Sequence, residues 1–481
     1  MLVLAKLNRP VVAILAVGVI AGALRFSHLG YPERRMFDEY YYPKSACVFL
    51  GYSDERCDIN SAHERLWRER VNDTGAWVHP PLGKWAIALG ELAVGTESYG
   101  WRVSSAIAGT ATVMLLAVIV QLLFASPIWT FTGGLLLATE SLNFVQSRIA
   151  MLDIFVTFFI VLGFAFLLLD RRWIERRMPT PSPDPSPDLE QGAPGPPRRI
   201  PAPLWRPWRF ACGAALGAGL ATKWSALTAI AAVTVLSFAW DVVRRRRFEV
   251  RRSFWDAFAS EGFGLVLAML VVPAVVYVVS YTGWFLHFGF DLGEWARLQS
   301  SMVDWHANLQ KVDVSGEPIH PYLSDAWSWL LLRRPVYYYG NYSPGGIRQV
   351  IYSNGNPAIF WGSLIAIPYV AFRWWLARDW RAGLVVVAIA GLYVPWFFVN
   401  RPQFLFYVTP LTPFLVLACV YAIRDLSEIH VAGSRSRPYL PVAVGFVVIS
   451  VLAFAWFWPA LTGAPLTEAG WKLRYWFTSW A

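Results

Sequence analysis

The residues best suited to chemistry begin with two adjacent carboxylates, Asp38 and Glu39, in the run Phe-Asp-Glu-Tyr-Tyr-Tyr-Pro-Lys at 37–44. Neighbouring side chains diverge on an extended or turning backbone, so one carboxylate can face a pocket while the other holds the loop. A partly desolvated Asp38 among aromatic rings would have a raised pKa and could act as a general base. The alternative is a pair of solvated loop acids with no catalytic role.

A second candidate is the sequence His-Pro-Pro-Leu-Gly-Lys at 79–84, which places a titratable ring, His79, and a cation, Lys84, around two prolines. Prolines stiffen the backbone, so they could hold both side chains in place. They could equally do no more than start a helix, with His79 an ordinary loop histidine. The motif gains weight because it follows the Asp-Glu pair.

Four further charged residues lie at the ends of hydrophobic runs: Arg102, Arg148, Asp153 and Lys223. Snorkelling explains a single terminal cation, because a long side chain can reach the membrane surface. Several charged groups at one outer level, on different helices, are better explained by an anionic headgroup site. A phosphate is the natural ligand.

An aromatic segment with arginines contains Trp327, Arg334 and Tyr337. Such side chains either anchor a protein at the membrane interface or hold sugars and peptides by stacking and forked hydrogen bonds, and both interpretations stay open. Arg401 joins two hydrophobic runs on the same side, and we expect its role to be structural.

The elements that must position these residues are membrane helices. The 481-residue chain is 56% hydrophobic and 16% aromatic with 26 Trp, which indicates a multi-spanning membrane protein. Its net charge of +10 sits in basic clusters between apolar runs. That placement is typical of cytoplasmic membrane loops and excludes a nucleic-acid binder.

Hydropathy predicts an all-α polytopic membrane protein with about eleven transmembrane helices and two sizeable external loops. The spans are expected near 10–26, 103–124, 127–143, 154–169, 210–221, 226–240, 263–281, 357–372, 383–399, 405–423 and 441–458. Basic residues precede the first span and recur in the loops on that side, so the N-terminus is predicted inside and the C-terminus outside. The first span resembles a signal peptide but lacks a small-residue cleavage site, which favours a retained anchor.

The chain then divides into segments by composition. They are an anchor at 1–26, an external loop at 27–99, helices at 100–170, a cytoplasmic Pro-rich linker at 171–207, helices at 208–282, a second external loop at 283–356, helices at 357–458 and an external tail at 459–481. Apolar spacing at 85–93 and at 292–309 predicts two amphipathic helices that lie on the membrane surface. The linker is expected to be disordered, although its prolines could bind a partner domain.

The four cysteines give little direct information about function. Cys47 and Cys57 share an external loop, so they are either disulfide-bonded or two unlinked thiols. Cys212 and Cys419 lie in apolar spans and are expected to fill the core.

Taken together, four short motifs resemble those of the protein O-mannosyltransferases. In chain order they are Phe37-Asp38-Glu39, His-Pro-Pro-Leu-Gly-Lys at 79–84, Ser147-Arg148 with Leu152-Asp153, and Thr222-Lys223-Trp224. The Arg-Pro-Val-Tyr-Tyr stretch at 334–338 agrees, and the resemblance covers nearly the whole chain. Eukaryotic members carry a large β-trefoil insert in the second external loop. Residues 283–356 cannot hold one, so the chain looks like a bacterial, actinobacterial member.

The resemblance implies a GT-C glycosyltransferase fold in the plasma membrane. It implies inverting transfer of mannose from a polyprenyl-phosphate donor to Ser or Thr of exported proteins, outside the cell. No cofactor or metal is implied, because arginines can match the charge of a lipid monophosphate. The partners would be the bilayer, the lipid-linked donor and exported polypeptides, and a link to the export translocon stays open.

The resemblance also assigns roles to residues. Asp38 would be the base that takes the proton of the acceptor hydroxyl, and Glu39 would orient Asp38 or the acceptor. The expected phosphate ligands are Arg102, Arg148, Lys84 and Lys223. The positioning residues would be His79, Asp153 and, more weakly, His306, with Trp327, Arg334 and Tyr337 as acceptor or sugar contacts.

Three other interpretations follow from the same sequence. A related GT-C enzyme could use the same kind of donor on a lipid or cell-wall glycan. A transporter of lipid-linked sugars would place its polar residues at mid-membrane depth, whereas here they collect at helix ends. A structural scaffold predicts no convergence of charge.

Overall fold

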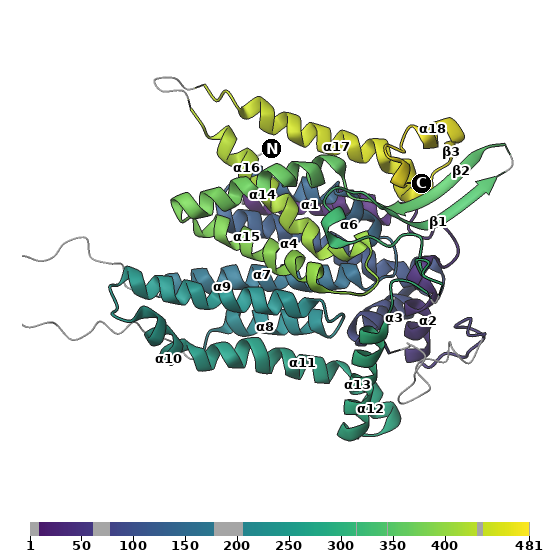
Figure 1. Cartoon of the computed structure of the whole chain (residues 1–481), viewed down its shortest axis with the longest axis horizontal. Coiled ribbons are helices and arrows are strands. Elements are labelled where there is room, and N and C mark those ends of the chain that lie inside the picture. Colours follow the sequence, from purple (N-terminus) through teal and green to yellow (C-terminus); the bar gives the residue numbers. More distant parts are fainter. Residues whose placement is uncertain are drawn as a thin grey trace, which may run out of the picture.

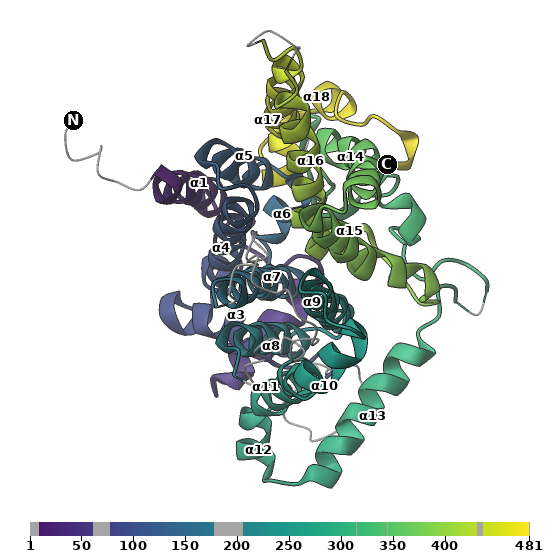
Figure 2. The ribbon, with the colours of Figure 1, turned by 90° about the vertical axis from the view of Figure 1, so that its left-hand side faces the viewer.

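The computed structural model describes residues 9–60, 77–177, 205–313, 315–343, 345–430 and 436–480. Long helices run side by side along the longest axis, and short helices and a β-hairpin gather at one end (Figure 1). Seen along that axis, many of the long helices are viewed nearly end-on (Figure 2). Most of the predicted Pro-rich linker at 171–207, namely residues 178–204, lies outside the described residues.

The first half of the chain is helical wherever regular structure is described. Its elements are α1 (Arg9–Phe26), the 3₁₀ turn η2 (Phe37–Tyr40), α2 (Tyr42–Phe49), α3 (Leu82–Val94), α4 (Ser98–Phe124), α5 (Pro127–Ala138), α6 (Ser141–Gln146), α7 (Asp153–Glu175), α8 (Pro207–Leu220) and α9 (Ala226–Arg247).

The second half adds a small sheet. Its elements are α10 (Ser253–Val266), the π-helical turn η4 (Leu267–Val271), α11 (Val272–Ser280), α12 (Thr282–Phe288), α13 (Leu292–Asn308), η5 (Ala326–Ser328), β1 (Val336–Ser343), β2 (Ile347–Ser353), α14 (Pro357–Ala377), α15 (Trp380–Tyr393), η6 (Val394–Phe398), η7 (Leu405–Leu411), α16 (Thr412–Ser427), α17 (Leu440–Thr462), β3 (Leu466–Thr467), α18 (Glu468–Lys472) and η8 (Thr478–Trp480).

Nine helices in the described residues are long and apolar enough to cross a membrane, compared with the about eleven spans that hydropathy predicts. The two exceptions are α5 and α8, of 12 and 14 residues. At 1.5 Å per residue they extend roughly 18 and 21 Å, less than the roughly 30 Å of a hydrocarbon core. The predicted span at 127–143 breaks because the Glu140 side chain accepts hydrogen bonds from the Leu142 and Asn143 N–H groups and starts α6 there.

The prediction of an all-α protein misses a three-stranded antiparallel sheet in the order β1-β2-β3. β1 and β2 form a hairpin in which Val336 faces Ser353 and Ser343 faces Ile347. Tyrosines and β-branched residues favour strands, and Gly345 and Gly346 both adopt a positive φ in the turn between them.

The short elements at the hairpin end pack into a second apolar cluster. It contains Trp284 of α12 and Leu298 of α13, which pack with residues of α2 and of the segment after it. Both predicted amphipathic helices are therefore present, as α3 and α13, and in α13 Leu298 and Met302 are buried. Their location on a membrane surface stays a prediction.

At the other end of the long helices, buried charges join four of them. This far-end charge cluster consists of Asp170 on α7, Arg206 and Arg209 at the start of α8, Asp241 on α9 and Glu261 on α10. Arg206 donates to Asp241 at 3.0 Å and to Glu261 at 3.1 Å, and it also contacts Asp170. Removing one partner of such a network leaves an uncompensated buried charge, so the cluster holds these helix ends together.

Candidate active site

A cavity of about 570 Å³ lies at the hairpin end of the helices. Its walls come from segments far apart in the chain: η2, α2, the start of α3, the residues before α9, the end of α13 and the loop before η7. Its titratable and charged lining residues are Asp38, Tyr41, Tyr42, His79, Lys84, Lys223, His306, His320, Arg401 and Tyr407. Such a concave site with converging polar groups is the usual form of a small-molecule site.

The Asp-Glu pair diverges, as the sequence predicts. Asp38 lines the cavity, where the Tyr42 hydroxyl donates to its carboxylate at 3.5 Å. Glu39 is fully buried, and the Met36 and Ala150 N–H groups donate to it at 3.1 and 2.9 Å. Glu39 therefore fixes the turn that presents Asp38.

Arg102 completes that arrangement and does not line the cavity. It is fully buried and donates to both oxygens of Glu39, at 2.8 and 2.7 Å. Its remaining hydrogen bonds go to the carbonyls of Leu29, Pro32 and Arg34. All five guanidinium donors of Arg102 thus face protein acceptors.

Arg148 is likewise occupied away from the cavity. Its guanidinium donates to the carbonyls of Leu24, Arg25 and Ser27 at 3.3, 2.9 and 2.6 Å, and to that of His28 at 3.3 Å. These carbonyls belong to the last turn of α1 and to the two residues after it, where a helix leaves acceptors without partners. Arg148 therefore caps α1 and fixes the start of the segment that carries Asp38.

The remaining motifs meet beside the cavity. Lys223 donates to both oxygens of Asp153, at 2.9 and 3.1 Å, and lines the cavity itself. Gly83 packs tightly against the side chains of Leu152 and Thr222, which belong to the two later motifs. A Cβ added at Gly83 would lie 2.7 Å from Leu152 and 2.8 Å from Thr222. A glycine is needed at this close approach, next to Lys84, which lines the same cavity as Lys223.

A smaller cavity of about 220 Å³ shares His79, Lys223, His306 and Arg401 with the larger one. Its other walls are Trp224, Ser225 and Thr228 at the start of α9, and Pro395, Trp396 and Val399 at η6. The lining of this smaller cavity is more apolar than that of the larger cavity. The four shared residues form the junction of the two cavities.

The histidines at this junction are held in place by neighbours. The His306 Nε2 lies 2.8 Å from the Val78 carbonyl, and its Nδ1 contacts the Arg401 guanidinium. The rings of His79 and His306 have centroids 5.4 Å apart. Burial, with Arg401 nearby, lowers the pKa of His306 to about 4, and burial, with Lys223, lowers the pKa of His79 well below its usual value.

The electrostatics of the cavity favour proton transfer near neutral pH. Burial raises the pKa of Asp38 to about 6, an effect that Asp153 strengthens and Lys223 opposes. Burial also lowers the pKa of Lys84 to about 7. A carboxylate and an ammonium group thus both titrate in the range where a general base and a switchable cation can work.

Three predicted contact residues lie elsewhere. Arg334 donates to the carbonyls of Pro321 and Ser479, at 2.9 and 2.8 Å, and the Tyr337 hydroxyl donates to the Trp480 carbonyl at 2.9 Å. Trp327 is half exposed. Arg334 and Tyr337 hold the C-terminal segment on the hairpin, and none of the three lines either cavity.

Conversely, the structure adds residues to the site. Tyr42 lies four positions after Asp38, a spacing that could have suggested the contact. Arg401, expected to be structural, lines both cavities. His320 and Tyr407 carry no signal in the sequence, because only the tertiary fold brings them there. In the part of the chain that the structure describes, no group of three His, Cys, Asp or Glu side chains could hold a metal ion.

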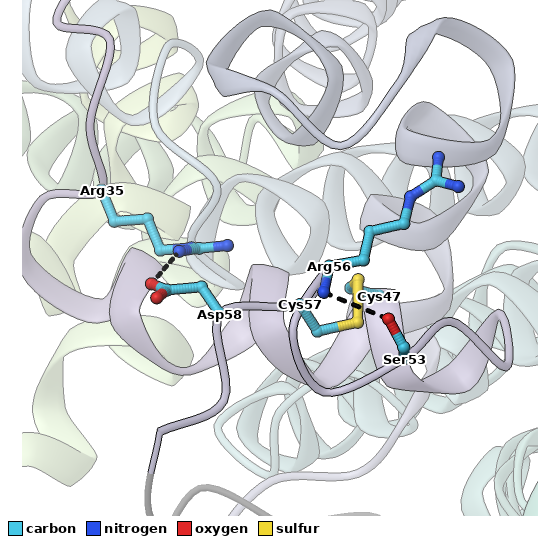
Figure 3. Close-up of a disulfide and its surroundings, with 6 residues drawn as sticks. All are labelled: Arg35, Cys47, Ser53, Arg56, Cys57 and Asp58. Atoms are coloured by element: carbon cyan, nitrogen blue, oxygen red, sulfur yellow. Dashed lines mark hydrogen bonds and ion pairs between the residues drawn. A yellow bond between two sulfur atoms is a disulfide. The ribbon is translucent and has the colours of Figure 1, made fainter.

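A disulfide between Cys47 and Cys57 settles the question left open by the sequence (Figure 3). It ties the end of α2 to a turn in which Asp58 accepts a hydrogen bond from Arg35 at 2.7 Å. Because α2 begins with Tyr42 and contains Ser45, both of which line the cavity, the disulfide braces one cavity wall.

Comparisons with protein families agree with the family resemblance that the sequence shows. A family model described as dolichyl-phosphate-mannose-protein mannosyltransferase matches residues 15–178. A second, described as the C-terminal four TMM region of protein-O-mannosyltransferase, matches residues 292–480.

Similar proteins cover most of the chain. A polyprenol-phosphate-mannose--protein mannosyltransferase of Mycobacterium tuberculosis is 30% identical over 89% of this chain and 86% of its own length. The protein of that name from Mycolicibacterium smegmatis is 30% identical over 96% and 92%.

Two solved structures share the fold. The Saccharomyces cerevisiae Pmt1-Pmt2 complex bound to the sugar donor aligns with a TM-score of 0.76 at 14% identity, over 99% of this chain and 93% of that one. ArnT from Cupriavidus metallidurans bound to undecaprenyl phosphate aligns with a TM-score of 0.52 at 14% identity, over 97% and 75%. The expected GT-C fold is confirmed by these likenesses.

Proposed function

This chain belongs to the protein O-mannosyltransferase family, and from that membership we propose that it transfers mannose from a polyprenyl-phosphate-mannose donor to Ser and Thr hydroxyls of polypeptides. It is a multi-pass membrane protein. The reaction takes place at the outer face of the plasma membrane, with the N-terminus inside, and its acceptors are exported chains.

The donor phosphate lies at the junction of the two cavities. Lys223 and Arg401 line both cavities, and Lys84 lines the larger one, so three cations surround a space that a phosphate can enter. Arg102 and Arg148, whose donors face protein carbonyls and Glu39, serve as positioning residues. The first isoprene units occupy the smaller, more apolar cavity beside Trp224 and Trp396.

Asp38 is the general base of the transfer. The acceptor oxygen attacks the anomeric carbon of mannose, and its proton passes to the Asp38 carboxylate. The bond from that carbon to the phosphate oxygen breaks, and the lipid phosphate leaves with its added negative charge facing Lys223 and Arg401. One displacement of this kind inverts the anomeric configuration.

The observation that carries this proposal is that Asp38 is the only carboxylate lining the cavity among the described residues. Glu39 is bound to Arg102, and Asp153 is bound to Lys223. A double displacement would need a nucleophile as well as an acid-base group, so a single carboxylate favours a single displacement.

The test uses purified full-length protein with polyprenyl-phosphate mannose and a threonine peptide. Asp38→Asn should lower the rate by about 10²- to 10⁴-fold while the protein still binds donor. Glu55→Gln, at an exposed acid of the same loop, is the matched control and should leave the rate unchanged. Near-normal turnover by Asp38→Asn would refute the base, and a product with retained configuration would refute the single displacement.

A second experiment separates polypeptide acceptors from lipid or glycan acceptors. Exported proteins from wild-type and deletion strains are compared for mannose on Ser and Thr. Loss of that mannose supports the proposal, whereas unchanged glycoproteins with an altered glycolipid would contradict it.

A further inference from the structure

The hairpin of β1 and β2 ends in an exposed edge strand. In the described part of the chain, β1 pairs with β2 alone, and β3 joins the other side of β2. The first half of β1 is largely buried, while Gly340–Ser343 is exposed on every residue. In Figure 1 the hairpin projects beyond the helices, with α18 on the β2 side.

This edge lacks the usual protection against strand pairing. Natural edge strands are blunted by Lys, by Pro, by inward-pointing charge or by bulges. β1 has the sequence Val-Tyr-Tyr-Tyr-Gly-Asn-Tyr-Ser, without a charged residue or proline. Its one irregularity falls between Tyr337 and Tyr339, in the buried half, so the exposed half has regular register with β2.

The buried half of β1 packs against a residue that lines the cavity. The ring of Tyr338 packs 4.9 Å from that of Phe37, which lines the cavity next to Asp38. The Tyr338 hydroxyl also accepts a hydrogen bond from Gln146 at 2.6 Å. From Tyr338 to Ser343 the strand extends roughly 17 Å at about 3.4 Å per residue, so the exposed edge runs from solvent toward the residue that packs on the cavity wall.

We propose that the exposed edge of β1 at Gly340–Ser343 binds the acceptor polypeptide as an added, extended β-strand, and so guides its hydroxyl residue to Asp38. The inference rests on the proposed function, because it assigns the polypeptide subsite of the same reaction. Strand addition draws affinity from main-chain hydrogen bonds, and side-chain pockets add specificity. An edge without charged side chains selects for an extended chain and little else.

The first test is a scan of backbone N-methylation along a peptide with a single threonine. N-methylation removes one main-chain donor, and in a strand only alternate residues direct their N–H groups to a given neighbour. The KM of the peptide should therefore rise about three- to tenfold at alternate positions on one side of the threonine, with kcat little changed. If the unmethylated peptide is not mannosylated, the proposed function fails. If it is mannosylated and methylation has no alternating effect, only the edge proposal fails.

The second test changes the enzyme by Asn341→Pro and Tyr342→Pro, made separately. The backbone N–H groups of these two neighbouring residues point to opposite sides of the strand. One proline therefore removes an N–H directed to β2, and the other removes an N–H at the exposed edge. The edge variant should keep its melting temperature and raise the peptide KM, without changing the KM of the lipid donor. If both variants fold and the KM of the peptide is unchanged in both, the proposal is overturned. If both variants misfold, the N-methylation scan of the peptide alone tests the proposal.

Discussion

Glu39 and Arg102 form a fully buried, two-point ion pair one residue away from Asp38. Both oxygens of the carboxylate and two nitrogens of the guanidinium take part, so the pair fixes the orientation of the η2 turn. The strength of a buried pair shows when one partner is lost, since the other charge is left without compensation.

Arg102→Met should therefore destabilise the protein by about 3 to 5 kcal/mol, because Glu39 would stay buried without its partner. Glu39→Gln combined with Arg102→Met should recover part of that loss. Thermal unfolding in detergent is measured for the wild type, for each single variant and for the double variant, which completes the double-mutant cycle. Additive effects of the two changes would contradict the coupling.

The rate should depend on pH through Asp38. A base works only when ionised, and burial raises the pKa of Asp38 to about 6. We expect kcat/KM to fall about tenfold per pH unit as pH drops below about 6, where the carboxylate becomes protonated. A profile that stays flat down to pH about 4.5 would show that no group with so raised a pKa is needed.

Lys84 should set an alkaline limit. Burial lowers the pKa of Lys84 to about 7, so its positive charge is present below about pH 7 and lost above it. Lys84→Arg keeps the charge at all these pH values and should extend activity to higher pH. An unchanged alkaline limb in Lys84→Arg would remove Lys84 from the phosphate site.

Arg401 and Arg148 should behave differently when each is changed to alanine. Arg401 lines both cavities, so Arg401→Ala should raise the KM of the lipid donor more than that of the peptide. Arg148 caps α1, so Arg148→Ala should mainly lower the melting temperature. If Arg148→Ala raised the KM of the lipid donor and Arg401→Ala mainly lowered the melting temperature, the two assigned roles would be wrong.

Gly83→Ala should disturb the site by overpacking. The added Cβ would lie 2.7 Å from Leu152 and 2.8 Å from Thr222, at a cost of about 1 to 3 kcal/mol. Thr222→Ser removes the nearby methyl group and should restore part of the loss. Gly445→Ala is the matched control, because nothing lies within 4 Å of a Cβ there. Equal losses of stability in Gly83→Ala and Gly445→Ala would contradict the close packing at Gly83.

The disulfide should support both stability and activity. Cys47→Ser with Cys57→Ser should lower the free energy of unfolding by about 2 to 4 kcal/mol. Because α2 forms a cavity wall, the peptide KM should also rise. Thiol labelling of intact cells with and without reductant checks the bond, and labelling of both cysteines without reductant would disprove it.

Most of the long membrane helices follow from the sequence, because apolar length is a local signal. Of the residues that the sequence singles out for chemistry, Asp38, His79, Lys84, Lys223 and His306 line the cavity. The sequence does not separate Arg148, which caps α1, from Lys223, which lines the cavity, since both follow the same pattern in the chain. The partner of Glu39 lies 63 residues away, and nothing local indicates it. The β-hairpin could have been predicted from the sequence, because tyrosines and β-branched residues around two glycines are a local strand signal.

The far-end charge cluster has a mechanical consequence. Asp153 and Asp170 lie at opposite ends of α7, about 26 Å apart at 1.5 Å per residue. Separating the helices at the Asp170 end would leave several buried charges without partners. At the Asp153 end, a single ion pair with Lys223 links α7 to the start of α9. The charge cluster at the Asp170 end therefore resists separation of these helices more strongly than the single ion pair at the Asp153 end does.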